Sequence, residues 1–379
     1  MKVFVIIDSG GLYGKERANL QVANILKDAG MDVTLLVNEI NTAVREEIKD
    51  FRTFDIPFPR RLKGKILFLK YVRAFFLSNK AVYKLLRKEK PDYLLVPTEI
   101  ELAYLYPTLR RNSVKVVFRC GDSPLVNRKH GVAAKIYAYL WKNLFLKRVD
   151  TLVCNARFIQ EQMFEAGRSA SEGDRLIYNY PPERRICEDD IVYASCEGAV
   201  RFGFLGRLVA DKGVKELIEA TIALTKKGHK VMTYIGGGNH VSSKYIDGLY
   251  HVVEEYAEVA SQIQFLGSVK DLDKFFANVD VVVIPSIYPE PMANVATEAK
   301  FHHKPVVIFN QGGLPEIVRH QTDGYICNDV SVEGLMEGLL YYIENPDMIA
   351  IHGENAYRSI ELLDLTKASF TNKWLDVFQ

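Results

Sequence analysis

The sequence has few cysteines, no long hydrophobic run and almost no net charge. Its five cysteines are odd in number and scattered without a C-x-x-C pair, which argues against a zinc site or a disulfide framework and favours a reducing compartment. No apolar run approaches the roughly 20 residues that a membrane-spanning helix needs, and the first apolar run ends at Asp8, too early for a signal peptide. We therefore expect a cytoplasmic protein.

The net charge of +2 hides two halves of opposite sign. Residues 1–190 carry 33 Lys and Arg against 23 Asp and Glu, whereas residues 191–379 carry 16 against 24. A chain of 379 residues also exceeds the roughly 250–300 residues over which one hydrophobic core extends, so two domains are expected. A basic half and an acidic half predict different partners for these domains.

Short apolar runs alternate with helical patterns along the chain. An apolar run at residues 3–7, a glycine-rich turn at 9–14, a helical pattern over 16–29 and an apolar run at 33–37 predict a βαβ unit. The pattern breaks near residue 181, and a second alternating series begins at residue 200. The predicted fold class is α/β, with two doubly wound, Rossmann-like domains at 1–182 and 200–364 and a linker at 183–199. Residues 365–379 are predicted to form a C-terminal helix that could pack back on the N-terminal domain.

Ligands of doubly wound sheets bind beyond the carboxyl ends of the strands, so residues that follow a strand carry most weight. Gly206 and Arg207 follow one predicted strand and Lys212 precedes the next helix, and two cations beside a helix N-terminus suit a diphosphate. Residues 236–238 and Gly267 follow the next two strands, where glycine allows backbone to approach a ligand closely. Each loop alone could equally be a turn with solvated charges.

The strongest signal follows the predicted strand at residues 281–284. Seven residues separate Glu290 from Glu298, and a helix starting near Pro291 would place them about 12 Å apart along its axis and facing roughly the same side. Two such carboxylates suit hydroxyl groups at the ends of a diphospho-linked ligand, with the backbone amides of residues 292–294 beside the diphosphate. The alternative is a pair of surface glutamates on an amphipathic helix.

In their order, these segments resemble the retaining glycosyltransferases of family four type, which have the GT-B fold and an E-x7-E motif. The resemblance extends over most of the chain. Its segments are Gly206-Arg207 with Lys212-Gly213, Gly236 to Gly238, Phe265-Leu266-Gly267, Glu290 to Glu298, and Pro305-Val306-Val307 with Gly312-Gly313-Leu314-Pro315-Glu316-Ile317-Val318; in the first half, Gly10-Gly11 with Glu16-Arg17 and Ile177-Tyr178-Asn179 are also similar. GT-B proteins have two Rossmann-like domains that face each other across a cleft.

The resemblance implies a nucleotide-diphosphate sugar in the C-terminal domain and an acceptor in the N-terminal domain. Arg207 and Lys212 would neutralise the diphosphate of the leaving group. Glu298 would bind the ribose hydroxyls and Glu290 the sugar hydroxyls, and the anomeric configuration would be retained. The implied catalytic residues are Glu290, Arg207, Lys212 and Asp122, and the implied donor-binding residues are Gly10, Gly11, Gly206, Gly236, Gly237, Gly267, Met292, Ala293, Asn294 and Glu298.

Three segments depart from the family pattern. Met292-Ala293 replaces a common Phe-Gly, so the identity of the sugar does not carry over. His303 stands where glycine is usual. Where many members have a histidine next to the sugar, this chain has residues 119–122, and we expect Asp122 to serve the reaction while Arg119, together with Tyr13, contacts acceptor or sugar.

Neither a cofactor nor a metal is expected. A metal-dependent transferase would want a D-x-D motif, and Asp271-Leu272-Asp273 matches that pattern. Its place at the start of a predicted helix, where negative charge is favourable, indicates a capping role instead.

Two basic segments carry most of the excess charge of the first half. Residues 60–90 contain eleven Lys and Arg and a single acid, Glu89, and residues 125–148 contain six and no acid, both with aromatic residues interleaved. Basic amphipathic helices of this kind suit an anionic membrane surface, where a lipid-linked acceptor would lie. Solvated helices with core-facing aromatics are the alternative, and no recognition motif supports binding to nucleic acid.

The sequence therefore predicts a retaining hexosyltransferase. It would move a hexosyl or N-acetylhexosaminyl unit from a UDP- or GDP-sugar to a glycan or lipid-linked acceptor in bacterial-type polysaccharide assembly, such as lipopolysaccharide or capsule, in the cytoplasm or at the inner membrane face. An epimerase of the same fold and a non-catalytic glycan-binding relative are the alternatives. No further acid/base residues for an epimerase are identified, and the four charged residues of the donor loops argue against the second.

Overall fold

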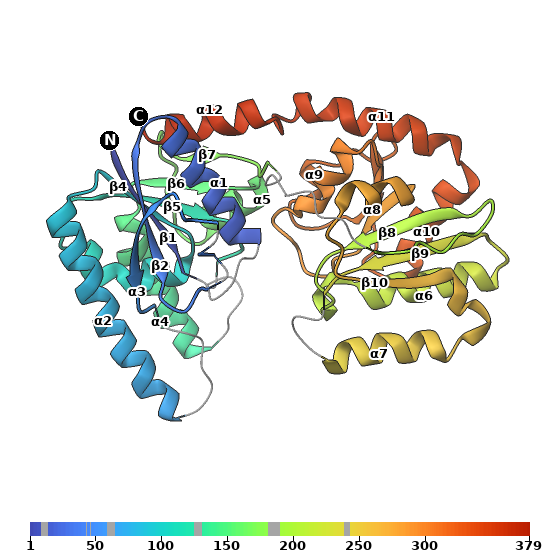
Figure 1. Cartoon of the computed structure of the whole chain (residues 1–379), viewed down its shortest axis with the longest axis horizontal. Helices are drawn as coiled ribbons and strands as arrows, with labels where there is room; N and C mark the ends of the chain where they lie inside the picture. Colours follow the sequence, from blue (N-terminus) through green and yellow to red (C-terminus); the bar gives the residue numbers. More distant parts are fainter. Residues whose placement is uncertain are drawn as a thin grey trace. The chain divides into compact units, whose positions relative to one another are not determined.

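The computed structural model describes residues 1–8, 14–42, 44–45, 47–58, 65–124, 131–180, 190–238 and 243–379, without the side chains of 65–70, 133 and 243. It divides into two compact units, Met1–Pro182 with Lys367–Gln379, and Glu183–Thr366. Each unit is a parallel sheet with helices on both faces, so the predicted α/β class with two Rossmann-like domains is confirmed (Figure 1). Gly10, Gly11, Tyr13, residues 60–64 and 125–130 of the basic segments, and residues 183–189 of the predicted linker lie outside the described residues.

The first unit contains a seven-stranded sheet in the order β3-β2-β1-β4-β5-β6-β7. Side chains of β1 alternate between two cores, with Phe4 and Ile6 in one and Val3 and Val5 in the other, as expected for a strand covered on both faces. The strands are β1 (Lys2–Ile7), β2 (Asp32–Asn38), β3 (Arg52–Ile56), β4 (Tyr93–Val96), β5 (Lys115–Cys120), β6 (Thr151–Cys154) and β7 (Arg175–Leu176).

The helices of the first unit cover the two faces of its sheet. On one face lie α2 (Lys65–Glu89), α3 (Glu99–Leu109), α4 (Val132–Leu140) and α5 (Arg157–Glu165); on the other lie α1 (Gly14–Asp28) and α12 (Lys367–Val377). The last helix therefore completes the core of the first unit. Its end is fixed by Phe378, whose ring centroid lies 5.2 Å from that of Tyr93 on β4.

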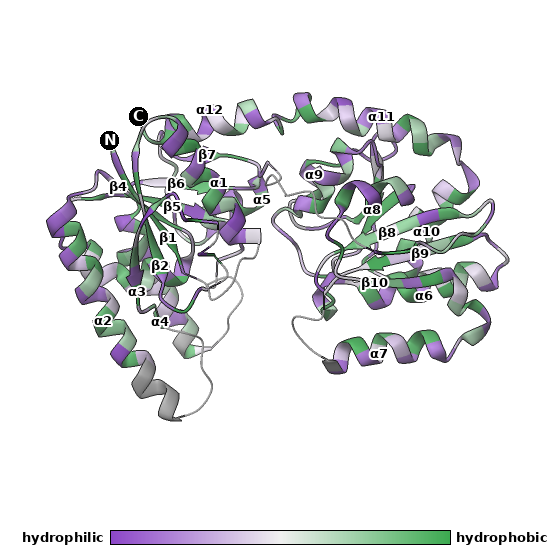
Figure 2. Cartoon of the chain, in the orientation of Figure 1, coloured by the Kyte–Doolittle hydropathy of each residue, from purple (hydrophilic) through white to green (hydrophobic). Residues whose placement is uncertain are grey.

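The second unit contains a six-stranded sheet in the order β10-β9-β8-β11-β12-β13, and β8 and β9 are predominantly hydrophobic (Figure 2). The strands are β8 (Val200–Leu205), β9 (Val231–Gly236), β10 (Ile263–Gly267), β11 (Val281–Ile284), β12 (Val306–Phe309) and β13 (Gly324–Cys327). The helices are α6 (Val214–Lys226), α7 (Ser243–Glu254), α8 (Leu272–Asn278), α9 (Asn294–Phe301), α10 (Val332–Glu344) and α11 (Asp347–Leu362).

The described end of the predicted linker is bound to the second unit. Gln264 on the edge strand β10 donates to the carbonyl of Val192 at 2.6 Å and accepts from the amide of Ala194 at 2.8 Å. Val192 and Ala194 therefore belong to the second unit although they precede its first strand, β8. They add no strand to the sheet, because their backbone bonds to a side chain of β10 and not to its backbone.

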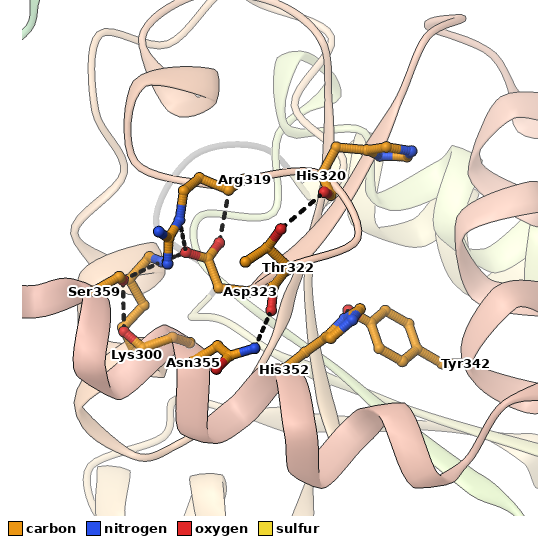
Figure 3. A network of polar contacts seen from close by, with 10 residues as sticks. Lys300, Arg319, His320, Thr322, Asp323, Tyr342, His352, Asn355 and Ser359 are labelled. Atoms are coloured by element: carbon orange, nitrogen blue, oxygen red, sulfur yellow. Dashed lines mark hydrogen bonds and ion pairs between the residues drawn. The ribbon is translucent and has the colours of Figure 1, made fainter.

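A buried ionic network anchors helix α9 (Figure 3). The fully buried Lys300 Nζ lies 3.2 Å from Asp323 Oδ2 and donates to Ser359 Oγ on α11 at 2.9 Å, while Arg319 Nε donates to the same Asp323 oxygen at 2.9 Å. Burial lowers the pKa of Lys300, and the negative charge of Asp323 opposes that shift. The network fixes the C-terminal end of α9 to α11 and to the loop before β13.

Candidate functional site

The second unit has a topological switch point between β8 and β11. These strands are neighbours, but the chain leaves β8 towards β9 and leaves β11 towards β12, on opposite sides. The loops after the two strands therefore diverge, which opens the usual ligand crevice of a doubly wound sheet. The loops predicted to bind the donor are the ones that surround this point.

The three glycine loops lie side by side through backbone contacts. The amide of Gly206 donates to the carbonyl of Gly236 at 3.0 Å, and the amide of Gly237 donates to the carbonyl of Gly267 at 2.7 Å. A Cβ atom on Gly237 would lie 2.2 Å from the carbonyl oxygen of Gly206. Glycine at position 237 is therefore required by the approach of the two loops to each other.

A second close approach joins the loop after β8 to the loop after β11. Gly213 has a φ of +68°, and a Cβ there would lie 1.7 Å from the carbonyl oxygen of Pro285. Just before it, in the 3-10 turn Ala210–Lys212, the carbonyl of Asp211 accepts from the amides of Ile287 and Tyr288 at 3.0 and 3.2 Å. The two loops therefore form one backbone assembly, which brings Lys212 to Glu290.

Lys212 and Glu290 form an ion pair at the centre of this assembly. Lys212 Nζ lies 2.6 Å from Glu290 Oε2, and their side chains are 20% and 9% exposed. Ser286 Oγ donates to the other carboxylate oxygen of Glu290. The sequence analysis missed Ser286, although a polar residue so soon after a buried strand is itself a signal.

The backbone of Glu290 is held as tightly as its side chain. Its carbonyl accepts from the amide of Gly313 at 2.7 Å, and a Cβ on Gly312, whose φ is +67°, would lie 2.3 Å from the same oxygen. The glycine pair after β12 therefore positions Glu290 through its backbone. This contact gives the glycines of that segment a structural cause.

Arg207 contrasts with Lys212. It follows Gly206 and is exposed, and its guanidinium makes no hydrogen bond or ion pair with any other residue that the structure describes. A guanidinium offers a planar pair of donors that fits phosphate oxygens. Of the two cations in the loop after β8, Lys212 is paired with Glu290 and Arg207 has no partner among the described residues.

Helix α9 begins at Asn294, three residues later than the predicted start near Pro291. The carbonyl of Glu290 accepts from the amide of Gly313 at 2.7 Å, and residue 293 keeps extended angles of −91° and 120°, so the chain is not yet helical there. Glu290 therefore precedes the helix, and Glu298 lies in it. Both residues are buried, with 7% and 5% of the whole residue exposed, which does not fit the alternative of two surface glutamates.

Met292 and Ala293 lie directly before α9 and are both buried. Ala293 occupies the N-cap position, where no side chain caps the helix, and its carbonyl accepts from the amide of Ala296 at 3.0 Å. The negative φ of Ala293 is open to any residue. Alanine in place of glycine here causes no backbone strain, but it adds a methyl group at the start of the helix.

His303, the other departure from the family pattern, has a φ of +53°. This left-handed conformation explains why glycine is usual at the position. The histidine ring stacks on Tyr357 with centroids 4.1 Å apart, and its Nδ1 lies 3.2 Å from Glu354 Oε2. Contacts with α11 thus accompany the unusual backbone angle.

In the first unit, the predicted residues Asp122 and Arg119 lie after and at the end of β5. Asp122 is exposed and its Oδ1 accepts from the amide of Ser123 at 2.9 Å. Arg119 is buried and donates to Asn19 at 2.9 Å and Asn179 at 2.8 Å, and burial lowers its pKa to about 10. Arg119 therefore ties α1 to the segment after β7, and the reactive roles of Asp122 and Arg119 stay predictions.

Comparisons with known proteins point in one direction. Two family models match in order: Glycosyltransferase Family 4 over residues 13–179 and Glycosyl transferases group 1 over residues 190–359. An uncharacterized glycosyltransferase of Methanocaldococcus jannaschii is 34% identical over 149 residues, which are 39% of this chain and 33% of that protein. The lipopolysaccharide core biosynthesis mannosyltransferase LpcC of Rhizobium leguminosarum is 24% identical over 265 residues, 69% of this chain and 70% of that protein.

Among solved structures, HepE of Anabaena in complex with UDP and glucose is similar with a TM-score of 0.76 and 18% identity, covering 100% of this chain and 99% of that one. Such a likeness at low identity concerns the fold. The chain spans between a third and a half of the length of the first curated relatives that it matches.

Proposed function

The chain belongs to the glycosyltransferases of family four type with the GT-B fold, and from this premise we propose that it transfers a hexosyl or N-acetylhexosaminyl unit from a nucleotide-diphosphate sugar. The acceptor is a glycan or a lipid-linked sugar in cell-surface polysaccharide assembly, and the configuration at the anomeric carbon is retained. The mannosyltransferase LpcC and the UDP complex of HepE support this proposal by similarity.

The observation that carries the proposal is the arrangement at the switch point of the second unit. One cation, Arg207, has no partner among the described residues, and a second, Lys212, lies 2.6 Å from a buried carboxylate, Glu290. A diphosphate needs cations, and a sugar hydroxyl needs a carboxylate or another acceptor. The site offers both within one backbone assembly.

Donor binding would rearrange the ion pair. Lys212 is paired with Glu290, so a diphosphate that binds Lys212 would leave Glu290 free to accept from a sugar hydroxyl. Arg207 and Lys212 would then stabilise the negative charge that grows on the leaving diphosphate. We propose UDP or GDP as the nucleotide and a transfer step that requires no metal ion.

A thermal-shift panel of UDP, GDP, ADP and dTDP tests the donor site, because a ligand that binds only the folded state raises its stability. We expect UDP or GDP to give the largest shift and Arg207→Ala to abolish it. Lys230→Ala, which removes an exposed lysine before β9, is the matched control and should keep the shift. No shift with any of the four nucleotides, or a full shift in Arg207→Ala, would refute the assigned site.

We further propose that the first unit binds an anionic membrane surface. Apolar residues are exposed on α2 and on the helical segment that starts with α4, including Phe76 at 66% and Tyr139 at 67%. Exposed cations lie on the same helical segments, and Glu89 is the only acid of α2. These cations are Arg73, Lys80, Lys84, Arg87, Lys88, Lys135, Lys142 and Lys147. Exposed apolar side chains and cations on the same helices suit the boundary of anionic headgroups and acyl chains.

No helix in the described part of the chain is long and apolar enough to cross a bilayer. Binding would therefore be peripheral, and co-sedimentation with vesicles tests it. We expect the protein to bind vesicles containing 30% phosphatidylglycerol at low salt, Phe76→Ser to weaken binding, and Ile351→Ser, at an exposed position of the second unit, to leave it unchanged. Equal binding to purely zwitterionic vesicles, or none to either, would contradict the proposal.

A further inference from the structure

The first unit has a switch point of its own, between β1 and β4. The chain leaves β1 towards β2 and leaves β4 towards β5, on opposite sides of the sheet. Asp8 directly follows β1, and Glu101 lies in the first turn of α3, which follows β4. Two acidic residues that are 93 positions apart thus meet where a doubly wound sheet usually binds its ligand.

Lys15 is the cation of this cluster. Its Nζ donates to Asp8 at 2.9 Å and lies 3.4 Å from Glu16 Oε1. Burial alone would lower the pKa of Lys15, but the negative charges of Asp8 and Glu16 outweigh it, so the pKa is raised and the ammonium group persists. The side chain of Lys15 is 35% exposed, so the cluster reaches solvent at this residue.

Glu101 completes the cluster from the other side of the switch point. Its side chain is almost fully buried and hydrogen-bonds Asp8, and burial followed by the charge of Asp8 raises its pKa well above the usual range. The raised pKa favours the protonated carboxyl, and in that form Glu101 can donate to the Asp8 carboxylate. Its second oxygen, Oε2, is buried and has no hydrogen-bond partner among the described residues.

A second buried group nearby also lacks a partner. Asn19 Nδ2 on α1 is buried and makes no hydrogen bond within the described ranges, although Asn19 Oδ1 accepts from Arg119 at 2.9 Å. A buried polar atom without a partner is unfavourable, so two of them in one region call for a ligand or ordered water. The cluster is therefore more than a group of acids that satisfy one another.

The chemistry of the cluster selects the kind of ligand. Lys15 faces two carboxylates, Asp8 and Glu16, which disfavours a phosphate. The charge of the buried Arg119 also acts on Glu16, but its guanidinium is already engaged in hydrogen bonds to Asn19 and Asn179. The site offers an ammonium donor, a carboxylate acceptor and a carboxyl group with an open oxygen. A sugar hydroxyl both donates and accepts, so neighbouring hydroxyls match this set.

We propose that Asp8, Lys15 and Glu101 form a binding site for the hydroxyl groups of a neutral sugar unit, and that this unit is the terminal part of the acceptor. The second half of this statement rests on the proposed transferase function. The first half stands without it, because it concerns only binding within the first unit.

Saturation-transfer NMR of the full chain with methyl glycosides tests the site. The probes are the methyl α-glycosides of glucose, galactose, mannose and N-acetylglucosamine at up to tens of millimolar. We expect at least one to bind, and Asp8→Asn and Lys15→Met to weaken it at least tenfold. Glu101→Gln, which keeps a neutral donor towards Asp8, should weaken binding less than either of these variants.

The control is Asp32→Asn, which removes an exposed carboxylate beside Lys2 at the amino ends of the strands, whereas Asp8 lies at their carboxyl ends. This variant should bind as wild type does. Because Lys15 is partly exposed, its variant is expected to fold even where Asp8→Asn does not. Wild type that binds no glycoside, or Lys15→Met that binds like wild type, would overturn the proposal. So would binding that depends on Glu290 instead, since it would locate the sugar in the second unit.

The nucleotide panel keeps this result apart from the proposed function. Glycoside binding that depends on Asp8 and Lys15 without any nucleotide shift would support the site and refute the transferase donor site. A nucleotide shift without such glycoside binding would support the donor site and refute the sugar site of the first unit.

Discussion

The two switch points use similar residue types but are assembled by different means. In the second unit, the ion pair of Lys212 and Glu290 is placed by backbone contacts, two of which leave no room for a Cβ at Gly213 and Gly312. In the first unit, side chains hold one another: Lys15 bonds to Asp8, and Asp8 to a buried carboxyl group.

This difference teaches how each site would respond to a ligand. A backbone assembly keeps its shape when an ion pair opens, which suits a charged donor whose position fixes the reacting bond. A side-chain cluster with unpartnered buried atoms can change its hydrogen bonds at little backbone cost, which suits a neutral acceptor. The predictions below test this contrast.

The largest effect is expected from Gly213→Ala. The new Cβ would lie 1.7 Å from a backbone oxygen at a φ of +68°, so one loop must move. We expect the free energy of unfolding to fall by about 3 kcal/mol, since left-handed angles cost about 1–2 and overpacking about 1–3 kcal/mol, and the nucleotide shift to disappear. Gly228→Ala, at a φ of +87° with no atom within 4 Å, should cost only about 1 kcal/mol in urea unfolding. Equal losses would show that the backbone approach does not build the site.

A smaller effect is expected from removing each lysine in turn. Lys212→Met should lower the affinity for the best nucleotide about 10- to 100-fold, because a hydrogen bond to a charged group contributes about 1.5–3 kcal/mol. Lys15→Met should change that affinity less than about twofold, although its lysine is also paired with a carboxylate. Isothermal titration calorimetry measures both. If Lys15→Met lowered the nucleotide affinity as much as Lys212→Met does, nucleotide binding would not be confined to the second unit, and the contrast would be wrong.

The pH dependence of stability sharpens the contrast further. The pKa of Glu101 is raised in the folded state by burial and by the charge of Asp8, so the native protein retains this proton above pH 4.5, where the unfolded chain releases it. Stability from this group is therefore present at low pH and lost as pH rises towards the folded pKa. Each unit of the shift corresponds to about 1.4 kcal/mol.

Glu101→Gln has no such proton to lose. Urea unfolding at pH 5 and pH 8 should show a smaller decline for this variant than for wild type, while Asp32→Asn should follow wild type. Parallel declines in wild type and Glu101→Gln would mean that Glu101 is ionised in the fold, and the first unit would then lack its neutral carboxyl donor.

The same contrast explains what could be predicted from the sequence. Gly213, Gly237 and Gly312 are needed because backbone approaches backbone, and such positions stand out in a sequence as glycines after strands. The pair of Asp8 and Glu101 leaves no local signal, because two single acids become neighbours only through the strand order. The close approach of these loops was therefore predictable, and the meeting of Asp8 and Glu101 was not.

A hydrogen bond between two loops explains where the helix prediction was wrong. The helix predicted between Glu290 and Glu298 is correct for the second half of the segment, since α9 starts at Asn294. The carbonyl of Glu290 accepts from the amide of Gly313 and takes no part in the helix. A hydrogen bond from a distant loop outweighs the local preference of proline for a first helical turn. At His303 the structure explains the family pattern, since its φ of +53° is the reason why glycine is usual there, and the sequence alone does not reveal this backbone angle.

The smallest effect concerns whether the donor site depends on protein cations alone. Asp271, the first carboxylate of the D-x-D segment, is the N-cap of α8 and accepts from the amide of Lys274 at 2.9 Å. Asp271→Ala should lower the free energy of unfolding by about 1 kcal/mol, and Asp271→Asn, which keeps a capping oxygen, should restore most of it. Nucleotide affinity in both variants should match wild type in the presence of Mg²⁺ and of EDTA. If Mg²⁺ instead raised the affinity of wild type and neither variant responded, Asp271 would be a metal ligand, and Arg207 and Lys212 would no longer suffice for the diphosphate.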